Sequence, residues 1–138
     1  MAPVAYQAYR QSQAATSGQA ELIVLLYRGA VRFAAKARIH LQNDELEGAH
    51  NALLKAQDIV VELMLGLSPL QEQVTQDLYA LHSYVYQVLY DANLRKETAL
   101  VDEALRHLRD LLATWEEIAL PRARPTLGGA VVSIDRRC

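Results

Sequence analysis

Glu47 and His50 are separated by two residues, a Glu-x-x-His spacing that places a carboxylate and an imidazole on one face of a helix. In bundles that bind a pair of metal ions, two helices each carry this motif and the other two each supply a glutamate. Neither His82 nor His107 follows a glutamate at the same spacing, so a second copy is missing. Glu47 also has the spacing from Asp44 of a helix-capping pair. The pattern therefore disfavours a metal site and a metal-dependent bundle enzyme.

Nucleophiles and phosphate-binding loops are the other patterns that would indicate catalysis. Cys138 lies in an irregular C-terminal segment, and no serine lies in a Gly-x-Ser-x-Gly sequence. Gly128 and Gly129 lack the third glycine, the preceding strand and the following helix that a phosphate loop needs. The four histidines are scattered, and we expect them at the surface or at the edge of the core. We therefore expect no enzyme activity, no metal and no cofactor.

Charge and composition exclude further classes of protein. The net charge of −2 gives no electrostatic footprint for nucleic acid. The single cysteine allows no disulfide within the chain, which fits a reducing compartment. The first residues lack the apolar region of a signal peptide, and no uncharged apolar run approaches the roughly 18–20 residues of a membrane span. We expect a cytoplasmic protein with no membrane span and no nucleic-acid partner.

Four segments repeat apolar residues with the period of an amphipathic helix, and turn signals separate them. The expected helices span about residues 19–41, 49–67, 69–93 and 98–120. Long helices joined by short turns predict an all-α fold, an antiparallel four-helix bundle, in one domain over residues 18–120. We expect residues 1–17 to form an N-terminal arm. Residues 121–138 carry two prolines, two glycines and four arginines, and we expect a basic, disordered C-terminal tail.

The second and fourth helices have clear apolar stripes for the core of the bundle. A helix that buries a single face shows one such stripe. In the second helix the expected core stripe consists of Leu46, Ala49, Leu53, Ala56, Val60, Leu63 and Leu67. In the fourth it consists of Val101, Ala104, Leu108, Leu111, Leu112, Trp115 and Ala119.

The second and third helices also carry surplus apolar residues that the core does not need. In the second helix Leu54, Val61 and Leu65 lie about 130° around the cylinder from the core stripe. In the third, tyrosines lie about 130° from an aliphatic core stripe, at Tyr79, Tyr86 and Tyr90. Apolar side chains that line up outside a core indicate a binding surface. Tyrosine suits such a surface because it offers a large apolar face and a polar tip.

We expect the two surplus stripes to line one groove for a partner, because consecutive helices are usually neighbours. The sequence leaves open whether both stripes face the same side. The alternative is that they pack against the first helix or against the N-terminal arm. Tyr6 and Tyr9 of the arm are further apolar groups, and we expect them to cover part of the groove when the partner is absent. A frayed terminus is the alternative for the arm.

Several stretches, in this order along the chain, resemble those of one known family. They are Ala8-Tyr9-Arg10-Gln11, Leu22 to Ala30, KAQDIVVEL from Lys55 to Leu63, Leu81 to Tyr86, Leu89 to Asn93 and Thr114 to Glu117. Through them the chain resembles the flagellar secretion chaperone FliS family over roughly Ala5 to Ile118. The first stretch is similar to the Ala-Tyr-Gln-Gln of that family, and KAQDIVVEL is the most similar one.

Four departures from the family pattern accompany these matches. Arg28 stands where the family usually has Asp or Asn, and Gln87-Val88 replaces a pair of arginines. Glu97 replaces the usual aspartate of the last turn, and Gly18-Gln19 replaces a Ser/Thr-Pro cap. The departures at Arg28 and Gln87-Val88 concern charged contacts with partners, and none of the four alters the expected bundle.

The resemblance implies a cytoplasmic chaperone of a flagellar type III export pathway that uses no nucleotide. Members of the family bind the C-terminal segment of newly made flagellin, keep it from premature polymerisation and help deliver it to the export gate. The expected partners are therefore flagellin and a component of the flagellar export gate, with the chain as a monomer or a homodimer. The alternative function is a structural or adaptor bundle that self-associates through the same stripes.

Overall fold

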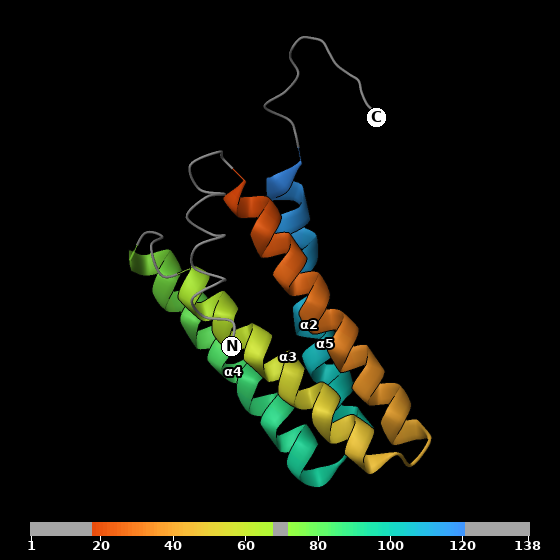
Figure 1. Cartoon of the computed structure of the whole chain (residues 1–138). Coiled ribbons are helices and arrows are strands. Elements are labelled where there is room, and N and C mark those ends of the chain that lie inside the picture. Colours follow the sequence, from red (N-terminus) through yellow and green to blue (C-terminus); the bar gives the residue numbers. More distant parts are fainter. Residues whose placement is uncertain (1–17, 68–71, 121–138) are drawn as a thin grey trace, which may run out of the picture.

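The computed structural model describes residues 18–67 and 72–120, with the side chains of residues 18–67 and 76–120. This part of the chain forms four helices and no strand: α2 (Gln19–Gln42), α3 (Leu46–Gly66), α4 (Glu72–Arg95) and α5 (Thr98–Ala119). They lie together as one bundle (Figure 1). The predicted all-α four-helix bundle is confirmed. The arm at 1–17, the tail at 121–138 and the Ser68-Pro69 turn lie outside the described residues.

Each helix packs against two others, and the order around the bundle is α2, α3, α4, α5. The seam between α3 and α4 therefore lies on the opposite side from the seam between α2 and α5 (Figure 1). Ion pairs cross the α2–α5 seam. Arg28 Nη2 lies 3.1 Å from Glu116 Oε2, and Arg38 Nε lies 2.5 Å from Asp102 Oδ1. Each pair joins an early position of one helix to a late position of the other.

Small side chains fill the seam between α2 and α3, which is the most extensive of the four. Alanines are buried on both helices at Ala30, Ala34, Ala37, Ala49, Ala52 and Ala56. Because an alanine ends at its Cβ atom, two helices lined with it can approach closely. The larger residues of the core, such as Leu53, Leu63, Leu89 and Leu108, are fully buried.

The turn between α2 and α3 differs from the prediction, because Asp44 does not cap α3. Asp44 has a left-handed backbone with a φ of 61°, and the N–H of Glu45 donates to the carbonyl of His40 at 2.8 Å. These features form the Schellman ending of α2, in which Asp44 occupies the left-handed position. The helix α3 then starts at Leu46 without a side-chain cap. The predicted Asp44–Glu47 capping pair is therefore wrong.

The core follows the expected stripes except at Leu46 and in the second half of α5, where Leu111, Leu112, Trp115 and Ala119 are only half-buried. Leu46 is 51% exposed, because it opens α3 at the end of the bundle. Trp115 is half-buried and packs against the core from the C-terminal half of α5. The first half of α5 is the part that is fully enclosed, at Val101, Ala104 and Leu108.

Tyr27 and His82 form a polar contact inside the core, where the sequence placed His82 at the surface or at the core edge. Both side chains are fully buried, and Tyr27 Oη lies 2.7 Å from His82 Nε2. His82 Nδ1 lies 2.6 Å from the carbonyl oxygen of Leu78. A carbonyl only accepts, so Nδ1 carries the proton and Nε2 accepts from the tyrosine hydroxyl. This bond joins α2 to α4 across the bundle.

Candidate functional site

The surplus stripes of α3 and α4 are at the surface of the bundle. Leu54, Val61 and Leu65 on α3 are between 40% and 48% exposed. On α4, Tyr79 is 58% and Tyr90 is 50% exposed. Tyr86 lies between them and is half-buried, with contacts to the core. Five of the six predicted groove residues are therefore exposed apolar groups, and the sixth forms part of the floor.

Two hollows lie on the seam between α3 and α4, and each is lined from both helices. The first, of about 390 Å³, brings Leu54 together with Tyr86 and Tyr90. The second, of about 350 Å³, brings Val61 and Leu65 together with Tyr79. The two stripes therefore face the same side, a point that the sequence left open. We call these two hollows and the six residues the α3–α4 groove; their role in binding stays a prediction.

The hollow of Val61, Leu65 and Tyr79 is the apolar end of the groove. Its other lining residues include Met64 and Leu67. Methionine adapts its shape to a partner because its unbranched chain has three rotatable bonds. This end suits aliphatic or aromatic side chains of a partner, whose burial would be driven by the removal of apolar area from water.

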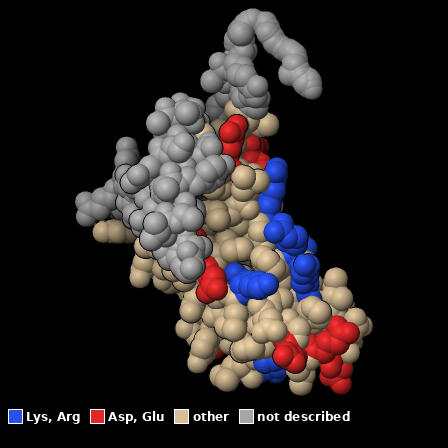
Figure 2. Space-filling view, in the orientation of Figure 1, with Lys and Arg blue, Asp and Glu red and all other residues tan. Residues whose placement is uncertain are grey.

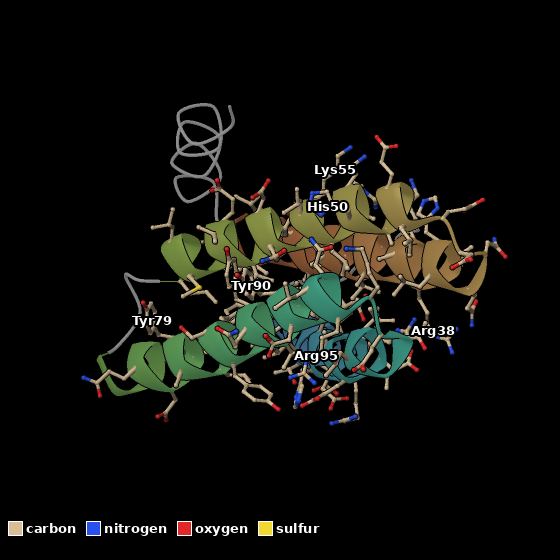
Figure 3. The ribbon with its side chains drawn as sticks, turned by 90° about the horizontal axis from the view of Figure 1, so that it is seen from below. Arg38, His50, Lys55, Tyr79, Tyr90 and Arg95 are labelled. Atoms are coloured by element: carbon tan, nitrogen blue, oxygen red, sulfur yellow. The ribbon has the colours of Figure 1, made fainter. Side chains whose placement is uncertain are left out.

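The hollow of Leu54, Tyr86 and Tyr90 is the polar end, because a network of hydrogen bonds borders it. Asn93 Oδ1 lies 3.2 Å from His50 Nδ1 and 2.8 Å from Lys96 Nζ. The ammonium of Lys96 also donates to the backbone carbonyl of Asn93. Figure 3 shows His50 on α3 and Tyr90 on α4 at the seam, with Tyr79 nearer the other end.

Gln57 is the functional candidate that the sequence reasoning missed. It lines the polar hollow, its residue is 4% exposed, and its Oε1 has no hydrogen-bond partner within the described residues. A signal was present, because Gln57 falls between Leu54 and Val61 at helical spacing. A polar residue that interrupts an apolar stripe indicates a polar contact within an apolar surface.

Positive charge gathers on a different face. Figure 2 shows Lys and Arg side chains gathered along the middle of α2. Three cations surround the ring of Phe33, with Arg32 Cζ and Lys55 Nζ at 5.4 Å and Lys36 Nζ at 5.6 Å from its centroid. Such contacts hold cations over an aromatic face. The groove instead presents aliphatic and tyrosine side chains, so the two faces suit partners of different chemistry.

Burial controls the ionisation of the two core residues that lie behind the groove. Loss of solvation raises the pKa of Tyr27, and a hydrogen bond from Trp115 lowers it in part. Loss of solvation also lowers the pKa of His82, partly offset by the hydrogen bond to Leu78. Both residues are therefore neutral at pH 7, which a dry core requires.

The Glu-x-x-His sequence does not lie in a cluster of potential metal ligands within the described residues. In residues 18–67 and 72–120 no three His, Cys, Asp or Glu residues lie close enough together to hold a metal ion. His50 instead bonds to Asn93, and Glu47 is exposed. None of the helices in this part of the chain is long and apolar enough to cross a membrane.

Comparison with known proteins identifies the family. Residues 1–122 match the family described as "Flagellar protein FliS". The chain belongs to the FliS family. It is 30% identical over 112 residues to the flagellar secretion chaperone FliS of Bacillus subtilis (strain 168), covering 81% of this chain and 84% of that protein.

Two further FliS relatives are similar to the same extent. The flagellar secretion chaperone FliS of Campylobacter jejuni is 30% identical over 116 residues, 83% of this chain and 91% of that protein. The one of Escherichia coli (strain K12) is 30% identical over 120 residues, 83% of this chain and 88% of that protein. These relatives are named as chaperones, which is not a class of enzyme.

Three departures from the usual FliS pattern have visible structural consequences. Arg28 forms the exposed ion pair with Glu116 on the seam between α2 and α5. Val88 is buried, whereas Gln87 is exposed and bonds to a carboxylate of its own helix. Glu97 is the N-cap residue of α5 but makes no side-chain capping bond there. None of these changes falls in the α3–α4 groove.

Proposed function

We propose that this chain is a cytoplasmic export chaperone that binds the C-terminal segment of flagellin in the α3–α4 groove. Binding would keep the segment from polymerising prematurely and would assist its delivery to the flagellar export gate. The observation that carries the proposal is the pairing of the two apolar stripes along one seam, in a chain of the FliS family. The proposed role needs no catalytic step, metal or cofactor.

The form of the groove supports a helical or partly helical client. An amphipathic helix lays its apolar face into a groove through residues spaced by three or four positions. On the chaperone side, Leu54, Val61 and Leu65 are spaced by seven and four positions, which also places them on one face of their helix. A segment that is disordered when free can fold onto such a surface, with binding offsetting the entropy lost on ordering.

The binding test uses the C-terminal segment of the flagellin from the same organism, titrated into the chaperone by calorimetry. A peptide of the same composition in scrambled order is the control for the client. Leu54→Ser alters the groove. Leu25→Ser is the matched control because Leu25 is also an exposed leucine, at 52% against 42% for Leu54, and lies on α2 away from the groove. We expect Leu54→Ser to weaken binding and Leu25→Ser to leave it unchanged.

A self-associating adaptor bundle is the alternative that the exposed stripes also fit. Sedimentation of the free protein and of Leu54→Ser separates the two. Assembly that depends on Leu54, together with no heat of binding for the flagellin segment, would replace the chaperone proposal. A chaperone that is a monomer, or a homodimer formed through another surface, has the same assembly state in Leu54→Ser as in the wild type.

We also propose that the arm at 1–17 covers part of the groove through Tyr6 and Tyr9 when the client is absent. The arm lies outside the described residues, so the support is its sequence, which carries the two tyrosines Tyr6 and Tyr9. A covering arm competes with the client. Deletion of residues 1–16 should therefore tighten binding, and weaker binding would show that the client uses the tyrosines itself.

A further inference from the structure

Gln57 presents an unpaired acceptor at the wall of the polar hollow. Oε1 has no hydrogen-bond partner in the described chain, and 4% of the residue is exposed. Buried polar atoms in folded proteins nearly always have a partner. The hollow beside this amide is open and about 390 Å³ in volume. An unpaired buried acceptor next to an open hollow indicates a ligand group that completes the bond.

The polar neighbours of Gln57 in the hollow are directed to one another. Asn93 Oδ1 is within hydrogen-bond distance of both His50 and Lys96. The remaining lining residues of the hollow are Leu54, Tyr86, Tyr90 and Leu94. None of these groups bonds to Oε1, so a partner that completes the bond would enter from the side of the groove. The terminal torsion of glutamine is soft, so a small rotation turns the amide toward the hollow.

We propose that Gln57 accepts a hydrogen bond from the client and fixes the register in which the client lies in the groove. This inference rests on the proposed function, since its client is the flagellin segment. The required group is an N–H or O–H donor, flanked by apolar atoms that cover Leu54 and Tyr86. The donor is a polar side chain of the client or a backbone N–H at a break in its helix.

The difference between the two hollows gives this bond its selectivity. The apolar end around Val61 and Tyr79 suits aliphatic groups, and the polar end suits one donor among them. A client shifted along the groove would place an apolar group over Gln57 and exclude water from it. The amide oxygen would then be buried without a partner, and this penalty disfavours the shifted register.

The experiment compares Gln57→Leu and Gln57→Met with Gln42→Leu, a matched control in which the amide is exposed at the end of α2. Each protein is titrated with the flagellin C-terminal segment and unfolded with urea without the client. We expect both Gln57 variants to bind about tenfold more weakly. The urea midpoint of the free protein should be unchanged or higher, because replacing an unpaired acceptor by an apolar group relieves its burial cost.

This opposite response of binding and stability separates a recognition role from a structural one. Alanine substitutions of polar client residues then locate the donor. A side-chain donor gives one substitution that weakens binding to the wild type and not to Gln57→Leu. If the donor is a backbone N–H, Gln57→Leu weakens binding, but no side-chain substitution in the client has the same effect. Gln57→Met carries the test if the leucine variant folds poorly.

Two results overturn the inference while the proposed function stands. One is that the wild type binds the segment and both Gln57 variants bind it equally well. The other is that the variants lose urea resistance in proportion to binding, which assigns Gln57 to the fold. A wild-type protein that does not bind the segment refutes the proposed function, and the inference falls with it.

Discussion

Removing the hydroxyl of Tyr27 tests the polar contact inside the core. In Tyr27→Phe, Nε2 of His82 loses its donor at a position that solvent does not reach. A buried acceptor left without a partner costs about 1–3 kcal/mol. A domain of this size is stable by roughly 5–15 kcal/mol, so the loss is readily measured by urea unfolding followed by circular dichroism. Tyr90→Phe is the control, because it removes a hydroxyl from a tyrosine that is 50% exposed.

The double variant Tyr27→Phe/His82→Leu shows whether the cost belongs to the pair. Replacing both partners by apolar groups of similar shape is nearly neutral, whereas removing one leaves the other unsatisfied. We therefore expect the double variant to lose less free energy of unfolding than the sum of the losses in Tyr27→Phe and His82→Leu. A coupling of about 0.5–3 kcal/mol is typical for residues in contact.

The same contact predicts how stability changes with pH. Burial lowers the pKa of His82 from its usual 6.5, so the unfolded chain binds a proton there more readily than the folded chain. The stability that His82 contributes is full above about pH 6.5 and decreases as the pH falls toward its folded-state pKa. Burial raises the pKa of Tyr27, so stability also decreases as the pH rises above its usual 10.0.

Two results would refute this account of the core. One is a loss below about 0.5 kcal/mol for Tyr27→Phe, which is the range of ordinary surface changes. The other is an acid dependence of stability, between pH 7 and pH 5, that is the same in the wild type and in His82→Leu. Either result would mean that the imidazole is not a buried, neutral acceptor.

Three further predictions concern the groove, α5 and the tail. Tyr90→Ala and Val61→Ser should each weaken binding of the flagellin segment by about 1–2 kcal/mol and change the free energy of unfolding by less than about 1 kcal/mol; calorimetry and urea unfolding measure the two, and wild-type binding in both variants would exclude these residues. Trp115→Ala should cost about 2–3 kcal/mol, less than a fully enclosed tryptophan, because its side chain is half-buried; a loss under about 1 kcal/mol in urea would show that its core contacts contribute little. Truncation after Leu120 should leave the melting temperature and client binding nearly unchanged; a clear fall in either, by calorimetry, would show that the tail docks on the bundle.

Periodicity was sufficient to predict the four helices and both stripes of the groove, because these depend on spacing within one helix. The turn at Asp44 was not predictable, because aspartate and asparagine suit both a helix N-cap and a left-handed helix ending. Only the backbone geometry decides between these roles, and here it assigns Asp44 to the end of α2.

Pairings between distant residues were also beyond the reach of periodicity. His82 counts as polar in any apolar pattern, yet a hydroxyl from Tyr27, 55 positions away, allows it to be buried. The sequence does not show that pairing. It also does not show the hollow beside Gln57, because the hollow forms only where α4 packs against α3. The orientation of the two stripes was unknown for the same reason. Only the packing of α4 against α3 shows that the two stripes face the same side of the bundle.

The closely packed seam between α2 and α3 has a consequence for the order in which the bundle forms. These helices are joined by a short turn, pack through alanines and form the most extensive of the four seams, whereas the seam between α4 and α5 is the least extensive. Contacts between neighbouring helices close small loops, so the α2–α3 hairpin can form first during synthesis or refolding. The α4 helix then joins a preformed surface, and the groove lies on the boundary between the early and late parts. A client bound across that boundary would hold α4 in place and slow its opening.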